Sequence, residues 1–200
     1  MKSKINKKIL VTFDLNCLLA YVAPSKVKDT SIVLADYPPH KSSDGYNIWI
    51  RPQSDFLFQT LFYRKKDIFD VGIWACQTKE NTAFQINQIF GSLKYNLKFA
   101  LFTKPESKDE ILPFPCKRDL RIIFDKHPEY DITNTIVFTN YLNELSEYRE
   151  NEVVIPLYHP DIGKTIFTLD SHLYYIAEYV MVLNALWSEN KSNVLYLISL

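Results

Sequence analysis

The chain has 200 residues, of which 47% are hydrophobic and 14% aromatic, and its 23 basic and 23 acidic side chains balance. This length and apolar content suffice for one core, so we expect a single domain over 1–200 with its core in 8–187. The zero net charge argues against a general nucleic-acid-binding surface, and no apolar run has the length and purity of a transmembrane segment.

The cysteine content indicates a reducing compartment. Cys17, Cys76 and Cys116 are an odd number in a chain without a secretory signal, which predicts free thiols in an intracellular protein. We expect the cytoplasm or nucleus, and a mitochondrial location stays open although no presequence is recognisable. No C-x-x-C spacing supports a zinc site, so the three thiols are interpreted as small buried apolar groups.

The first predicted element is a buried strand that ends on a carboxylate. Residues 8–13 are mostly apolar and Asp14 follows them, as in a central parallel strand that delivers one charged group to the carboxyl edge of a sheet. Ligands bind at that edge in open α/β folds. Residues 24–45 carry Pro, Ser and Asp-Gly turn signals, which predict a loop or a small β-hairpin insertion before a strand over 46–50.

Helices and strands alternate after this insertion. Arg51-Pro52 ends the strand, Thr78 is a suitable N-cap for one helix and Gly91 a suitable end for it. The alternation predicts an α/β three-layer sandwich with a mostly parallel central sheet. The predicted elements are a helix over 55–63, a strand over 69–76, a helix over 78–90, a strand over 97–102, a helix over 118–124, and strands over 135–138 and 153–157.

The last third of the chain contains an amphipathic pattern and an apolar end. Apolar residues at steps of four and three over 169–187 predict a helix that packs on the sheet and that Asp170 or Ser171 caps. Residues 194–200 are more apolar than a free tail. We expect them either to add a strand or to cover a surface, of this domain or of a partner.

Five short motifs follow one another within residues 8–187. They are Asp14-Leu15-Asn16-Cys17-Leu18, Arg51-Pro52, Val71-Gly72-Ile73-Trp74-Ala75-Cys76 with Thr78-Lys79-Glu80 behind it, Lys117-Arg118-Asp119-Leu120, and Ile136-Val137-Phe138-Thr139-Asn140-Tyr141. In this order they resemble the haloacid dehalogenase (HAD) superfamily, in its branch of NLI-interacting-factor (FCP/SCP-type) phosphatases that act on the RNA polymerase II tail. The resemblance implies the HAD-like fold.

The resemblance also implies which residues carried the chemistry. In that family the first strand ends in D-x-D-x-T, whose first Asp is the nucleophile and a Mg²⁺ ligand and whose second Asp is the general acid and base. Asp14 matches the first and Asn16 replaces the second, and an amide cannot give and take a proton. At the metal-binding acidic pair the first position is Thr139, so only Asn140 offers an oxygen.

The phosphate-binding positions are altered as well. Trp74 stands where the family has a hydroxyl, and Cys76 stands at the following Ser. The lysine that neutralises the phosphoryl intermediate corresponds to Lys117 or Arg118, depending on a one-residue choice of alignment. Losing the acid, the metal ligands and the phosphate contacts together removes most of the transition-state stabilisation.

These losses predict a catalytically inactive, phosphatase-like domain that binds proteins or serves as a structural subunit of a larger assembly, without a cofactor. Its expected partners are other protein subunits rather than nucleic acid or membrane. A precedent in the family is the mitochondrial inner-membrane import receptor, which works by binding. Two alternatives remain. One is a Mg²⁺-dependent protein serine/threonine phosphatase with Asp14 as nucleophile, and the other a non-catalytic phosphopeptide reader that uses Lys117 or Arg118.

Overall fold

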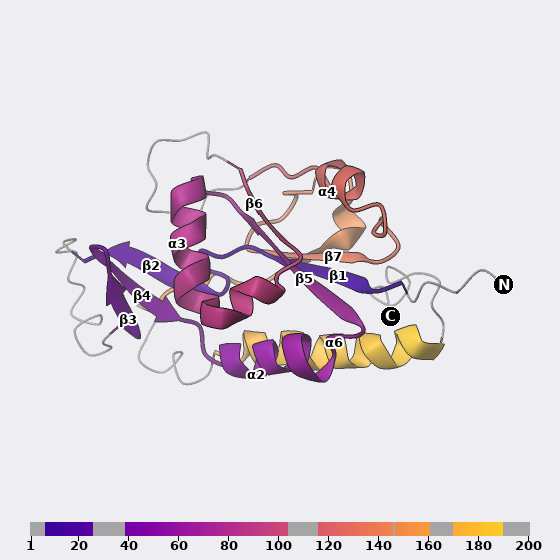
Figure 1. Cartoon of the computed structure of the whole chain (residues 1–200), viewed down its shortest axis with the longest axis horizontal. Helices are drawn as coiled ribbons and strands as arrows, with labels where there is room; N and C mark the ends of the chain where they lie inside the picture. Colours follow the sequence, from indigo (N-terminus) through magenta and orange to yellow (C-terminus); the bar gives the residue numbers. More distant parts are fainter. Residues whose placement is uncertain (1–6, 26–38, 104–115, 146, 161–169, 190–200) are drawn as a thin grey trace.

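A five-stranded sheet forms the centre of the computed structural model, which describes residues 7–25, 39–103, 116–145, 147–160 and 170–189 (Figure 1). All four strand pairs are parallel, and β1 lies in the middle between β5 and β7. The predicted mostly parallel α/β sandwich is confirmed. The strand order is β6 (Phe99–Phe102), β5 (Phe69–Ala75), β1 (Ile9–Phe13), β7 (Thr135–Thr139) and β8 (Glu152–Val154).

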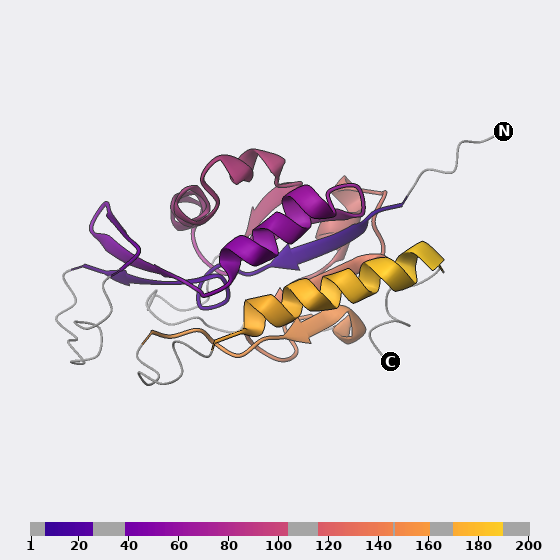
Figure 2. The same ribbon diagram turned by 90° about the horizontal axis from the view of Figure 1, so that it is seen from below.

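Helices cover both faces of this sheet, which explains why all five residues of β1 are buried. Ile9, Val11 and Phe13 belong to the core formed with α2, α3 and α6, whereas Leu10 belongs to the core formed with α4. Figure 2 shows α2 and α6 side by side along the sheet. The helices are α2 (Ser54–Gln59), α3 (Lys79–Phe90), α4 (Arg121–Lys126) and α6 (His172–Glu189), with short helical turns η1 (Thr60–Arg64), η2 (Gly91–Asn96) and η3 (Arg149–Asn151).

A second, three-stranded antiparallel sheet lies beyond the carboxyl end of β1 (Figure 1). β3 (Lys41–Ser43) and β4 (Tyr46–Ile50) form the predicted hairpin, and β2 (Ala20–Pro24) pairs with the other side of β4. Asp44 and Gly45 both have positive φ, as the turn of a two-residue hairpin requires. β2 was not predicted, because its residues continue the apolar run of β1.

The local signals of α3 act as predicted, whereas the start of α4 was predicted wrongly. The Asn81 N–H donates to Thr78 Oγ1 at 3.3 Å, and Gly91 ends the helix with φ 53°. The helix predicted over 118–124 begins only at Arg121, because Arg118 forms a β-bridge with Leu145 and is buried.

The other predicted elements are present with shifted ends. The helix over 55–63 is α2 continued by η1, and the strands over 97–102 and 153–157 shorten to β6 and β8. The apolar tail over 194–200 and most of the loop over 103–115 lie outside the described residues. No helix among the described residues is long and apolar enough to span a membrane.

Arg51, which the sequence marked as a strand end, ties three segments together from a fully buried position. Its Nε donates to both oxygens of Asp170, at 3.0 and 3.1 Å, and its Nη1 donates to the Leu18 carbonyl at 3.2 Å. The guanidinium also lies 5.6 Å from the ring centroid of Tyr158. Asp170 in turn accepts the His172 N–H at 3.2 Å, so the predicted start of the last helix is held by Arg51.

Candidate functional site

Asp14 follows β1 directly and lies at the carboxyl edge of the sheet, where its N–H donates to the Phe138 carbonyl at 3.3 Å. Only 9% of the residue is exposed. One carboxylate oxygen accepts the N–H of Leu15 at 2.6 Å, and the other accepts from the guanidinium of Arg118. Both oxygens are therefore engaged by groups of the chain itself.

Arg118 is fully buried and lies at the centre of the site. Its guanidinium bonds Asp14 on one side and Glu144 on the other, and its Nη2 donates to the Trp74 carbonyl at 3.1 Å. Its Nε has no hydrogen-bond partner among the described residues. Burial alone would lower the pKa of Arg118, but the two carboxylates outweigh it and raise that pKa above its ordinary value. Arg118 is a permanent cation between two acids.

Glu144 is a member of the site that the sequence interpretation missed. Its Oε1 accepts the Cys116 N–H at 2.9 Å while its Oε2 holds Arg118. Burial raises the pKa of Glu144 to about 7 against the opposing effect of Arg118. No local pattern marks this residue, because burial is irregular along its segment: Leu142, two positions before it, is 70% exposed, whereas Leu145 is fully buried. Only the need of a buried guanidinium for counter-charges points to it.

Asn16 and Asn140 reach the same edge of the sheet. Asn140 follows β7, and its Nδ2 donates to the Asn16 backbone carbonyl at 2.8 Å. The Asn140 Oδ1 is buried and has no hydrogen-bond partner among the described residues. Cys17, next to Asn16, adopts a left-handed conformation with φ 57° and closes the turn into β2 by donating its N–H to the Ala20 carbonyl. Asn16 therefore lies at the start of this turn, two positions after Asp14 in the chain.

The cation opposite Asp14 is Arg118 and not Lys117. The two are neighbours in sequence, but Lys117 is exposed whereas Arg118 is buried. Cys76 directly follows the last residue of β5 and so lies at the same edge of the sheet. Of the sequence-predicted site residues, the structure thus gathers five at the edge and leaves Lys117 at the surface. The five are Asp14, Asn16, Cys76, Arg118 and Asn140.

The three thiols differ in ionisation. Burial, followed by the charge of Asp14, raises the pKa of Cys17 to about 12. Interaction with Cys116, followed by burial, raises the pKa of Cys76, whereas interaction with Cys76 lowers the pKa of Cys116. Within the described residues, no group of three or more His, Cys, Asp or Glu side chains is arranged to hold a metal ion.

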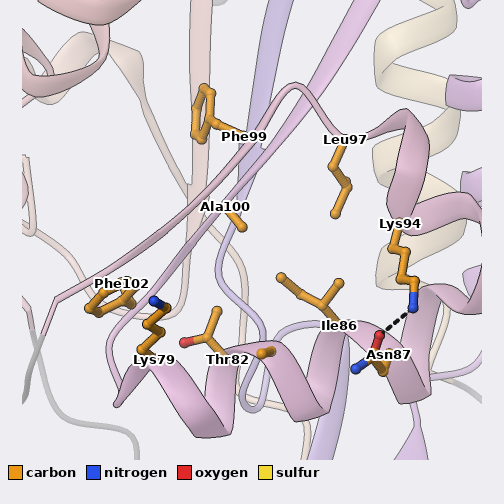
Figure 3. Close-up of a pocket in the computed structure, with 10 residues that line it drawn as sticks. Lys79, Thr82, Ile86, Asn87, Lys94, Leu97, Phe99, Ala100 and Phe102 are labelled. Carbon is orange, nitrogen blue, oxygen red and sulfur yellow. Dashed lines mark hydrogen bonds between the residues drawn. The ribbon is translucent and has the colours of Figure 1, made fainter.

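A separate groove lies between α3 and the edge strand β6 (Figure 3). Its volume is about 350 Å³, and its walls are largely apolar. Lys79 and Lys94 are its charged lining residues, and Lys94 donates to Asn87 Oδ1 at 2.7 Å. Phe102 is 47% exposed beside it. The groove is thus an apolar, positively charged surface on a sheet edge, built from residues outside the Asp14 site.

No protein-family profile matches the chain, and no curated protein matches it in sequence. The solved structures that are similar to it include two of RNA polymerase II CTD phosphatases. One is the structure of Fcp1, an essential RNA polymerase II CTD phosphatase, with 15% identity, a TM-score of 0.53, and coverage of 90% of this chain and 54% of that one. The other is an arginine-to-alanine variant of the fission yeast RNA polymerase II CTD phosphatase Fcp1 bound to beryllium fluoride, with 14% identity, a TM-score of 0.52, and coverage of 92% and 56%.

The chain therefore spans about half the length of these Fcp1 chains. At such low identity the likeness establishes the fold, and the predicted HAD-like architecture is confirmed. Membership of the NLI-interacting-factor branch stays a prediction from the motifs. The described chain thus shares its fold with about half of the Fcp1 chain.

Proposed function

We propose that this chain is a phosphatase-like domain that binds other proteins and does not hydrolyse phosphate esters. The observation that carries the proposal is the state of Asp14, whose two carboxylate oxygens are bound by the Leu15 N–H and by Arg118. An attacking carboxylate needs an oxygen that faces the phosphorus atom. Here one oxygen accepts the Leu15 N–H and the other is held in a buried ion pair with Arg118, and freeing the second would leave the Asp14 carboxylate without its cation.

The general acid of the family also lacks an equivalent. Asn16 stands in its place, and its amide has no proton to exchange at neutral pH. Removing a general acid lowers the rate of such reactions by about 10² to 10⁴. The missing general acid and the bound oxygens of Asp14 concern different side chains, so each supports the proposal independently of the other.

The donor set does not suit Mg²⁺, the metal that the fold family implies. Mg²⁺ prefers carboxylate oxygens and bound water in an octahedral arrangement. Asp14 is already neutralised by a guanidinium, Asn140 contributes one neutral oxygen without a partner among the described residues, and Glu144 is bonded to the same Arg118. A divalent cation at this edge would have to compete with Arg118 for both carboxylates and would gain one neutral ligand, Asn140. We therefore assign no metal step to this chain.

One observation favours the enzyme alternative. A carboxyl group with a pKa of about 7 is suited to general acid catalysis, and Glu144 has such a value. However, the Glu144 side chain is 1% exposed and is bonded to Arg118 and the Cys116 N–H. A substrate cannot touch it without displacing the ion pair. The raised pKa therefore agrees better with a buried charge cluster than with a catalytic acid.

The phosphopeptide-reader alternative meets a similar obstacle. Arg118 already donates to two carboxylates and to the Trp74 carbonyl. A phosphate would have to replace these contacts, whereas Lys117 is exposed and presents a single, mobile charge. Protein binding therefore agrees better with the contacts of this site than phosphopeptide binding does.

The groove between α3 and β6 is the surface through which we propose that the domain binds its partner. An edge strand beside a helix can accept an extended segment as an additional strand, with side chains entering the groove. Lys79 and Lys94 favour an occupant that combines apolar residues with acidic ones. The similarity to Fcp1 supports the fold that carries this groove. It does not identify the partner, so the RNA polymerase II tail is used below only as a test substrate.

Activity is tested with an aryl phosphate and with a phosphoserine peptide from the RNA polymerase II tail, each with Mg²⁺. Wild type, Asp14→Asn and Asn16→Asp are compared. We expect no turnover in the wild type beyond that of Asp14→Asn. Hydrolysis that Asp14→Asn abolishes would overturn the inactive assignment, and gain of activity in Asn16→Asp alone would show that one residue silences an otherwise competent site.

Binding is tested with a random peptide library displayed on phage. We expect enrichment of extended sequences that combine apolar with acidic residues, and loss of their binding in Lys79→Glu and Phe102→Asp. Tyr63→Asp is the matched control, because Tyr63 is 62% exposed on η1 and lies outside the groove. Peptides that bind all three variants equally would place the partner surface elsewhere.

A further inference from the structure

Helix α6 has two apolar sides, and only one of them is buried in the core, as Ile176 and Val180 are. The other side is a stripe whose side chains recur at steps of four, three and four and so lie in one line along the helix. The α6 stripe consists of Tyr175, Tyr179, Val182 and Leu186. Tyr175 is 64% exposed and Val182 is 57% exposed, so the α6 stripe presents apolar surface that the core does not use.

The first half of the α6 stripe forms one wall of a groove between α6 and the edge strand β8. This α6–β8 groove has a volume of about 330 Å³ and almost entirely apolar walls. Tyr175 and Tyr179 line it from α6, and Val153 and Ile155 line it from β8 and the residue after it. None of its described lining residues is acidic, and His172 is the one basic residue among them. The groove lies at the opposite edge of the sheet from the groove between α3 and β6.

The chain itself contains an occupant of matching chemistry. Residues 194–200, with the sequence Val-Leu-Tyr-Leu-Ile-Ser-Leu, include six apolar residues and no charge. They follow Glu189, the last residue of α6, after the four polar residues 190–193. A tether this short holds the segment at an effective concentration of roughly millimolar, which favours it over a free partner of similar affinity.

The length of this segment fits a path back along α6. From Tyr175 to Glu189 the helix rises by about 21 Å, since each residue adds about 1.5 Å. Residues 190–200 can span up to about 36 Å when they are extended. The segment is therefore long enough to turn after α6, follow the α6 stripe and enter the α6–β8 groove.

Pairing with β8 as a sixth strand agrees less well with the topology. α6 runs antiparallel to β1 (Figure 2), so a segment that returns along α6 runs parallel to β8. α6 and α2 pack on the same face of the sheet, and the connection β1–α2–β5 crosses that face in the direction away from β8. A parallel strand outside β8 would therefore give a crossover of the opposite hand, although parallel crossovers almost always share one hand. Side-chain packing on the α6 stripe requires no such crossover.

We propose that residues 194–200 pack on the α6 stripe and fill the α6–β8 groove of their own chain. The segment then covers apolar surface at Tyr175 and Val182 that is otherwise available for association between copies of the chain. The inference uses neither the Asp14 site nor the groove between α3 and β6, so its test is independent of the proposed function.

The test measures hydrogen exchange of the full chain by mass spectrometry, at a low and at a high protein concentration. We expect the amides of 194–200 to exchange at least about tenfold more slowly than in a synthetic peptide of residues 190–200, at both concentrations. Exchange at the rate of the peptide would overturn the proposal. Protection that appears only at the high concentration would assign the groove to a second copy and would contradict it equally.

Two variants of neighbouring residues locate the contact. Val182→Asp places a charge in the α6 stripe and should bring the exchange of 194–200 to within about twofold of the peptide, while the β1 amides keep their protection and show that the domain is folded. Met181→Asp is the matched control, because Met181 is exposed on α6 but lies outside the stripe, and it should leave 194–200 protected. Release of the segment by both variants or by neither would show that it does not pack on the stripe. If Val182→Asp does not fold, Tyr175→Ser at the groove should release the segment in its place.

Discussion

Two arginines of the described chain are fully buried, and they differ in the number of acids around them. Arg51 has one carboxylate, that of Asp170, together with the Leu18 carbonyl and the face of Tyr158. Arg118 has two carboxylates, those of Asp14 and Glu144. The first is a matched pair, and the second carries an excess negative charge when both acids are ionised.

This difference separates a structural cluster from a candidate site. A matched buried pair is stable once formed and ties the start of α6 to the turn after β1. An unmatched cluster relieves its excess charge by binding a proton, which agrees with the pKa of about 7 to which burial raises Glu144. The two acids meet Arg118 at the carboxyl edge of the central sheet, whereas the Arg51–Asp170 pair joins the end of β4 to the start of α6.

Arg118→Met should have the largest effect of any substitution at these two clusters. It leaves Asp14 and Glu144 as buried carboxylates without a cation, which costs about 3–5 kcal/mol of unfolding free energy. Urea unfolding monitored by tryptophan fluorescence measures this loss. Lys117→Met is the control in the neighbouring exposed position and should change stability by less than about 0.5 kcal/mol. Similar losses of unfolding free energy in the two variants would contradict the conclusion that Arg118 is the buried partner of both carboxylates.

Arg51→Met should cost less, about 2–3 kcal/mol, because only one carboxylate loses its partner and Asp170 keeps the His172 N–H. The loss should concentrate at α6. Hydrogen exchange measured by mass spectrometry should show that the variant exchanges faster than the wild type in α6, with a smaller increase in β1. Uniform exchange over the whole chain would indicate that Arg51 supports the core in general and not the docking of α6.

The acids themselves provide a sharper comparison. Asp170→Asn removes the carboxylate that Arg51 binds in the described chain and should cost about 2 kcal/mol, whereas Asp14→Asn leaves Arg118 with Glu144 and should cost less than about 1 kcal/mol. Equal unfolding free energies for the two variants would remove the distinction between matched and unmatched clusters. The same urea titrations, run side by side, supply both values.

The last prediction concerns the dependence of stability on pH. Because the pKa of Glu144 is raised in the folded state, folding binds a proton between the unfolded value of 4.5 and about 7. This contribution is fully present below pH 4.5 and is lost as the pH rises through about 7, with a slope of at most about 1.4 kcal/mol per pH unit. Urea unfolding between about pH 5 and 8 should show this decline in the wild type. A Glu144→Gln variant should show a flatter profile, and an unchanged slope would exclude Glu144 as its source.

Local signals predicted most of the fold. The apolar run of β1, the Thr78 cap, the Gly91 end and the four-and-three spacing of α6 depend on neighbours along the chain, and each appears in the structure at or near its expected place. Prediction failed at β2 and at the start of α4. In both cases a tertiary contact overrides local preference, through pairing with β4 and through the burial of Arg118.

By itself the sequence determined that Asp14 ends a central strand, that Asn16 lacks an exchangeable proton, and that strands and helices alternate, since these follow from residue type and spacing. Only the tertiary structure decided that Arg118 and not Lys117 faces Asp14, and that Glu144 completes the cluster. These contacts join segments far apart in the chain. Whether a charge or a thiol is buried, paired or reactive depends on neighbours that only folding supplies.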